Sequence, residues 1–262
     1  MGNALTTPIK VAQELIKTRA NRIPAWEIAF LLDNHNFRVA GGCFMDDTPN
    51  DYDVYPAFGV TFDHERIRSN LKSLDGEVLY SSKNALTVKV GGKVIQFCRF
   101  YKTTLAELVA SFDFSHCQVG VEYRARDNGE GGYAYPKLES MEWTDDWMRY
   151  RINGQSTYTG SEYPLSSLIR MNKYVKRGII KGKSYVVEAL KILRDIISRG
   201  YVDYPDFKDQ LDAVDLLLLQ PDESNAAWQL FIACQGRGMM SKFYTPDELE
   251  ALKTEDELRE VQ

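Results

Sequence analysis

The sequence predicts an α+β fold in which a half that mixes helices and strands precedes an all-helical half. Up to about residue 123, short runs rich in Val, Ile, Phe and Tyr alternate with helical patterns. From about residue 160 only the helical spacing of apolar residues recurs, and the stretch between is rich in Gly, Asn, Asp and Glu. We therefore expect an α/β domain over residues 1–123, a loop-rich connection over 124–160 and a helical domain over 161–262.

The elements of the first half follow from apolar spacing and from punctuating residues. Pro8 and Pro24 suit the first turns of two helices, Asp63 can cap a third, and Gly91-Gly92 suits a hairpin turn. Helices are expected over residues 7–20, 24–34, 62–74 and 104–111, and strands over 37–40, 53–55, 77–80, 85–90, 94–100 and 117–123, with Phe114 extended before the last.

The second half is separated into helices by Pro205, Pro221 and the Gly236/Gly238 pair. Helical spacing is expected over residues 165–177, 185–199, 206–219, 224–235 and 245–262.

Composition and charge exclude several classes of protein. The net charge of −5 argues against non-specific duplex binding over the whole surface, but it leaves room for a local basic groove. The run Leu216–Leu219 is far too short to span a bilayer, and no secretory signal pattern is visible. Four scattered cysteines without CxxC spacing are typical of reduced thiols. We expect a cytoplasmic protein that does not enter a membrane.

The most informative motif is Gly41-Gly42 followed by Asp51-Tyr52-Asp53. A glycine pair permits a tight turn and a close approach of the backbone to a ligand. Asp51 and Asp53 are two residues apart on an expected strand, so their side chains share a face. Neighbouring carboxylates repel unless a cation lies between them, and hard oxygen ligands suit Mg²⁺. The motif therefore indicates nucleotide chemistry.

The order of these elements resembles the polymerase-β-type nucleotidyltransferase superfamily. A helix and a strand come first, then the glycine pair, and then a strand that carries Asp-x-Asp. The nearest branch contains tRNA nucleotidyltransferases, poly(A) polymerases of bacterial type and phage relatives. The resemblance implies a mixed sheet with flanking helices, followed by a helical region. It also implies ATP or another NTP as substrate, Mg²⁺ or Mn²⁺ as cofactor, and transfer of an NMP to a hydroxyl of an RNA 3′ end, a protein or a small molecule. The expected setting is the cytoplasm of a bacterium or of a phage-infected host cell.

The resemblance assigns roles to particular residues. Gly41 and Gly42 match the pair that holds the triphosphate, and Asp51 and Asp53 match the metal-binding and catalytic aspartates. Asp113, in a Phe-Asp-Phe-Ser segment that resembles the family's Asp-Phe-Thr, is a third catalytic candidate.

The sequence also departs from the family pattern. The family's third carboxylate belongs on a later strand, and the inward position on the strand expected over 94–100 is the neutral Gln96. Asp46 falls in the family's Arg-Asp step, but Met45 replaces the arginine. These departures motivate the alternative of a degenerate member that binds nucleotide, nucleic acid or a protein without turnover.

A basic stretch over residues 170–183 follows the α/β half. Arg170 and Lys173 share a helical face and are candidates for contacts with the triphosphate or with RNA. A solvated helix face explains the same pattern.

Overall fold

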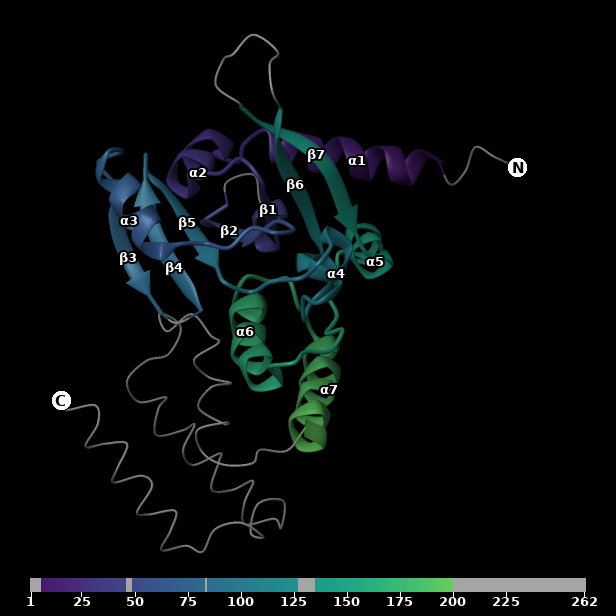
Figure 1. Ribbon diagram of the computed structural model, residues 1–262. Coiled ribbons are helices and arrows are strands. Elements are labelled where there is room, and N and C mark those ends of the chain that lie inside the picture. Colours follow the sequence, from purple (N-terminus) through teal and green to yellow (C-terminus); the bar gives the residue numbers. More distant parts are fainter. Residues whose placement is uncertain (1–5, 46–48, 83, 127–134, 200–262) are drawn as a thin grey trace, which may run out of the picture. The chain divides into compact units, whose positions relative to one another are not determined.

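The computed structural model describes residues 6–45, 49–82, 84–126 and 135–199. The chain forms two compact units, Met1–Thr159 and Gly160–Gln262. The first unit mixes strands and helices, and the described elements of the second are helices (Figure 1). The fold class is therefore α+β, as the sequence predicts. None of the described helices is long and apolar enough to cross a bilayer.

The first unit is built on a seven-stranded sheet with the order β3-β4-β5-β2-β1-β6-β7. The strands are β1 (Phe37–Ala40), β2 (Asp51–Pro56), β3 (Glu77–Ser81), β4 (Ala85–Val90), β5 (Lys93–Cys98), β6 (Val119–Arg126) and β7 (Tyr135–Trp143). The sheet is mixed, because β2 and β5 pair in parallel while the other neighbouring strands are antiparallel. Gly91 and Gly92, both with positive φ, form the turn between β4 and β5.

One face of the sheet carries the main apolar core. Helices α1 (Thr6–Ala20), α2 (Ala25–Leu32) and α3 (His64–Lys72) contribute to it. Asp63 caps α3 by accepting hydrogen bonds from the amides of Glu65 and Arg66, as its N-cap position predicts. The strand residues of this core alternate with those on the opposite face. Its fully buried members include Ile16, Ile28, Ile67, Val39, Val54, Phe97 and Val121.

The opposite face is covered over β1 and β6 by α4 (Leu105–Ala110), which a Thr104/Glu107 capping box starts. Gly120 lets this helix approach the sheet: a Cβ there would lie 2.8 Å from the Ala40 Cβ and 3.1 Å from Val109 Cγ1. Because α4 has only six residues, it covers only part of this face. Asp51 and Asp53, on the same face of β2, remain partly exposed.

Residues 124–160 contain more regular structure than the loop-rich connection expected there. Strand β7 pairs with β6 along the sheet edge, and α5 (Asp145–Asn153) follows a Thr144 cap. The segment Ser115–Cys117, expected to lead into a strand, is a short 3₁₀ helix before β6. The burial of β7 alternates along its length, as for a strand with one covered face.

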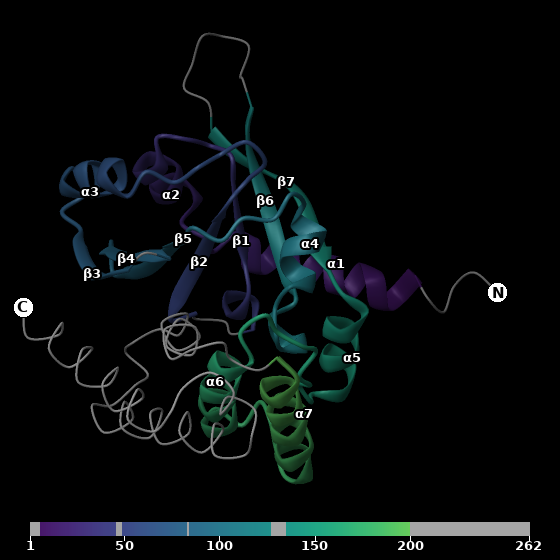
Figure 2. The same cartoon turned by 60° about the horizontal axis from the view of Figure 1, so that its bottom comes forward.

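The second unit begins with α6 (Pro164–Lys176) and α7 (Lys183–Arg199), which pack side by side (Figure 2). Met171 and Tyr174 on α6 and Ile192 and Ile196 on α7 are buried. The helices expected over 206–219, 224–235 and 245–262 lie outside the described residues.

Candidate functional site

The glycine pair forms a turn at the end of β1. Gly41 has φ 96° and ψ −145° and precedes a short 3₁₀ helix over Gly42–Phe44. Its amide donates to the Val119 carbonyl at 3.0 Å, which ties the turn to the start of β6. A Cβ built on Gly41 would lie 3.5 Å from Asp53 Oδ2, whereas one on Gly42 would meet nothing within 4 Å. The turn therefore lies against the Asp53 carboxylate and has open space at Gly42.

Strand β2 presents the two aspartates. Tyr52 and Val54 are buried in the main core, so Asp51 and Asp53 project from the other face, where both are partly exposed. Asp53 is flanked in register by Ala40 on β1 and by Gln96 on β5. The structure thus brings together Gly41, Asp51 and Asp53, three of the residues that the sequence singled out.

The negative charge of this pair raises the pKa of two nearby thiols, those of Cys43 and Cys98. Burial raises the pKa of the Cys43 thiol well above its usual value, and Asp53 and then Asp51 raise that pKa further. Burial and then Asp53 also raise the pKa of Cys98, against an opposing hydrogen bond from Tyr55. Both thiols therefore stay protonated at neutral pH. A local field of this sign suits a cation.

Gln96 lies beside Asp53 and is held by its neighbours. Its Nε2 donates to Thr87 Oγ1 on β4 at 3.1 Å, and its Oε1 accepts from the Cys98 thiol at 3.7 Å. Thr87 is the register partner of Gln96 across β4 and β5. The side chain next to Asp53 is thus a neutral amide, and its hydrogen-bond partners Thr87 and Cys98 are neutral as well.

The Phe112–Ser115 segment reaches the site through Phe112. The Phe112 ring would lie 3.4 Å from a Cβ on Gly41, and it packs edge-on against Tyr55 with ring centroids 5.9 Å apart. Buried Gln118 fastens the segment by donating from Nε2 to the Phe112 carbonyl at 2.9 Å. Asp113 itself is buried, and its carbonyl accepts from the Thr159 amide at 2.9 Å.

The described parts of the chain contain no group of three or more His, Cys, Asp or Glu side chains that could hold a metal ion. Asp51 and Asp53 therefore stand as a pair there, and a catalytic role for Asp113 remains a prediction. Asp46 lies outside the described residues, while Met45 closes the glycine turn by donating from its amide to the Gly42 carbonyl.

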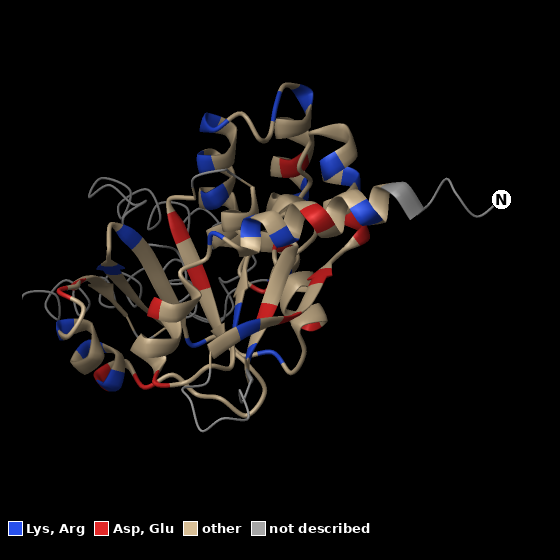
Figure 3. Ribbon diagram, turned by 90° about the horizontal axis from the view of Figure 1, so that it is seen from above, with Lys and Arg blue, Asp and Glu red and all other residues tan. Residues whose placement is uncertain are grey.

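The basic candidates belong to the second unit. Arg170 and Lys173 are half-buried on α6, one turn apart, and Lys176 and Arg177 beyond them are exposed. Across residues 160–199, nine Lys and Arg face three Asp and Glu in the sequence, and blue residues predominate on these helices in Figure 3. Their roles in binding remain predictions.

His116, next to the Phe112–Ser115 segment, is buried. Its Nδ1 lies 2.6 Å from the Ser156 hydroxyl, and its ring packs against that of Tyr150. His116 is therefore a packed residue of the interior.

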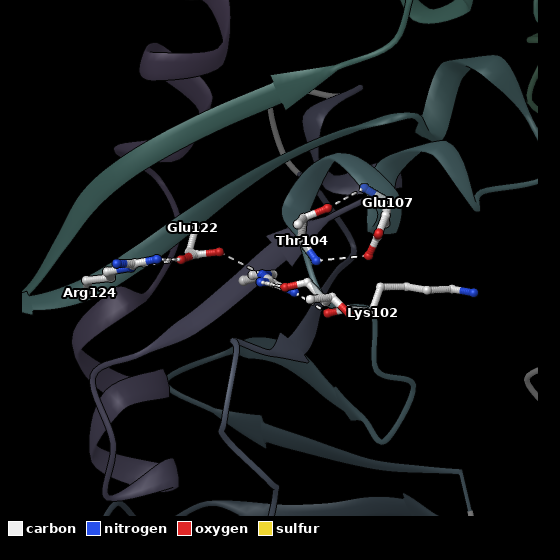
Figure 4. Close-up of polar contacts among 7 residues, drawn as sticks. Lys102, Thr104, Glu107, Glu122 and Arg124 are labelled. Carbon is white, nitrogen blue, oxygen red and sulfur yellow. Dashed lines mark hydrogen bonds and ion pairs between the residues drawn. The ribbon is translucent and has the colours of Figure 1, made fainter.

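A buried ion pair beside the site was missed by sequence reasoning. Arg38 on β1 donates from Nε to Glu122 Oε2 on β6 at 2.7 Å, and its Nη1 and Nη2 donate to the carbonyls of Lys102 and Thr103 at 2.6 and 2.9 Å. Glu122 also accepts from Arg124 (Figure 4). The pair fixes the loop that leads into α4. The only hint in the sequence is a charged residue inside an apolar strand.

No protein-family model and no curated protein matches the sequence. Among solved structures, the chain is similar to one described as a tRNA-processing enzyme with CTP, at 14% identity and a TM-score of 0.40, covering 66% of this chain and 46% of that one. It is also similar to a complex of a CCA-adding enzyme with CTP, at 14% identity and a TM-score of 0.42, covering 92% and 58%. A tRNA-processing enzyme in apo form matches at 12% identity and a TM-score of 0.41, covering 84% and 57%. The chain spans about half the length of these proteins, 46% of the first.

Proposed function

We propose that the protein binds a nucleoside triphosphate with Mg²⁺ or Mn²⁺ and transfers its NMP to a hydroxyl acceptor. The observation that carries the proposal is the position of Gly41 against Asp53, since a Cβ there would lie 3.5 Å from the carboxylate. The proposal is supported because a glycine turn can receive phosphate oxygens and the carboxylate pair beside it can hold a cation. Triphosphate chemistry needs both parts at one place.

In this proposal the aspartates bind the cation and the glycine turn receives the phosphates. Asp51 and Asp53 supply hard oxygen ligands on one face of β2, which fit one divalent cation. A bound cation of this kind neutralises the charge that develops on the reacting phosphoryl group. The open space at Gly42 lets the backbone approach the phosphates, and Tyr52 and Val54 anchor the strand in the core so that the carboxylates keep their positions.

The proposed acceptor is inferred from the positive charge of residues 160–199. An RNA 3′ end fits the excess of Lys and Arg over residues 160–199, where Arg170 and Lys173 would contact phosphates. A protein or small-molecule hydroxyl remains the alternative acceptor. RNA binding that weakens steeply with added salt, and that weakens further in Lys173→Ala, supports the RNA acceptor.

A second candidate function is nucleotide binding without turnover. Gln96 favours it, because a neutral amide stands beside Asp53 where a further metal ligand would complete a catalytic site. Calorimetric binding of an NTP with Mg²⁺, together with an absence of pyrophosphate release, supports this reading over transfer.

The direct test is to incubate the purified chain with labelled NTPs, Mg²⁺ or Mn²⁺ and host RNA. Asp51→Asn and Asp53→Asn should abolish both cation-dependent NTP binding and transfer, because each removes a charged ligand. Asp75→Asn is the matched control: Asp75 is exposed, and asparagine tolerates its positive φ of 49°. NTP binding that survives both site variants would contradict the proposed function.

A further inference from the structure

The side chains that flank Asp53 on the neighbouring strands are uncharged. Asp53 has Ala40 as its register partner on β1 and Gln96 on β5, and neither carries a charge. Beyond Gln96, the next strand presents Thr87. Across β1, β2, β5 and β4, the row at this level therefore contains one carboxylate, that of Asp53, flanked by uncharged side chains.

The Gln96 amide is also hydrogen-bonded to two neighbouring side chains. Its nitrogen donates to Thr87 at 3.1 Å, and its oxygen accepts from Cys98 at 3.7 Å. An amide oxygen is a weaker cation ligand than a carboxylate, because it carries no negative charge. Gln96 therefore offers little to a second cation.

The number of protein ligands limits how many cations the site holds. Asp51 and Asp53 supply two carboxylates, which together with phosphate oxygens can ligate one divalent cation. A second divalent cation needs a further anionic ligand from the protein, and the described residues bring no third acidic, histidine or cysteine side chain into such a group. The residues present fit one cation and do not fit two.

We infer that the site binds a nucleoside triphosphate with a single divalent cation, and that Gln96 is the residue that excludes a second. The inference rests on the proposed function, since it assigns the cation stoichiometry of that same site. Transfer with one cation is slow, because nothing at the Gln96 position helps to deprotonate the attacking hydroxyl.

A carboxylate at position 96 can replace the amide without disturbing the sheet. Glutamate has nearly the same shape as glutamine, and the Thr87 hydroxyl and the Cys98 thiol can each donate a hydrogen bond to it. Gln96→Glu therefore adds one negative charge beside Asp53 while keeping both neighbours satisfied. Gln96→Met, of similar length and neutral, is the matched control.

The experiment counts Mn²⁺ on the full chain with a non-hydrolysable NTP analogue. Calorimetry gives the stoichiometry, and electron paramagnetic resonance separates an isolated Mn²⁺ from a spin-coupled pair. We expect one uncoupled Mn²⁺ in the wild type and in Gln96→Met. We expect two coupled ions in Gln96→Glu, with the second Mn²⁺ bound at least roughly tenfold more tightly than in the wild type, about 1.4 kcal/mol. Pyrophosphate release from the natural NTP should rise in the same variant.

The possible outcomes separate the inference from the proposed function. Two coupled Mn²⁺ ions in the wild type would overturn the inference and leave the proposed function intact. A single uncoupled ion in a folded Gln96→Glu variant would overturn the role of Gln96. A wild type that binds neither Mn²⁺ nor nucleotide would overturn both.

Discussion

Replacing Gly41 by alanine tests whether the turn beside Asp53 needs a conformation that only glycine adopts. With φ 96° and ψ −145°, Gly41 lies close to a backbone region that is essentially restricted to glycine. Holding another residue there costs about 1–3 kcal/mol. Space is not the obstacle, because the added Cβ would stand 3.4 Å from the Phe112 ring and 3.5 Å from the Asp53 carboxylate, both ordinary contact distances. The expected loss of stability is therefore backbone strain.

Gly42→Ala is the matched control for this strain. Gly42 lies in the 3₁₀ helix, and an added Cβ would meet no atom within 4 Å. Both substitutions remove the same unfolded-state entropy, worth about 0.4–1 kcal/mol, so the difference between the two variants isolates the strain at Gly41.

Urea unfolding followed by tryptophan fluorescence measures this difference, since Trp26, Trp143 and Trp147 belong to the unit that contains the turn. The free energy of unfolding of Gly41→Ala should be about 1–3 kcal/mol below that of Gly42→Ala. Two variants of equal stability, within about 0.5 kcal/mol, would refute the reasoning.

Three further changes test the packing around the site. Arg38→Met leaves Glu122 buried without its main partner and should cost about 3–5 kcal/mol in urea unfolding, and adding Glu122→Gln should recover part of the loss; a cost below about 1 kcal/mol would contradict this. Gly120→Ala should cost about 1–3 kcal/mol, because its Cβ would lie 2.8 Å from that of Ala40, and Ala40→Gly in the same chain should restore stability; an absent rescue would count against the overlap. Burial lowers the pKa of His64 below its usual 6.5. The unfolded chain then binds the proton more readily, so stability should fall as pH drops below about 6.5, and His64→Gln should flatten that slope; unchanged slopes would argue against it.

Much of the first unit was readable from the chain because its signals are local. The strand over 37–40, the hairpin at Gly91-Gly92 and the cap at Asp63 each depend on a few adjacent residues, and the structure confirms them. The two-residue spacing of Asp51 and Asp53 likewise fixes their shared face.

The features that sequence reasoning missed depend on residues far apart in the chain, or on a strand whose pattern is hidden by the loop-like composition around it. Arg38 and Glu122 are 84 positions apart and meet only when β1 pairs with β6, so neither residue indicates the pair by itself. Strand β7 follows a glycine-rich stretch whose composition suggested a loop over the whole of 124–160. The hydrogen bond from the Gln96 amide to Thr87 depends on the register of β4 against β5, which no local pattern specifies.

The buried thiol of Cys43 gives the turn an intrinsic chemical reporter. Cys43 is only 7% exposed, and burial and the two aspartates raise its pKa, so alkylating reagents react with it only when the structure around it opens. The rate of its modification in the native protein therefore measures how often the segment next to Gly42 separates from the sheet. A ligand seated in the turn would slow that rate, so protection of this one cysteine can report occupancy without any labelled nucleotide.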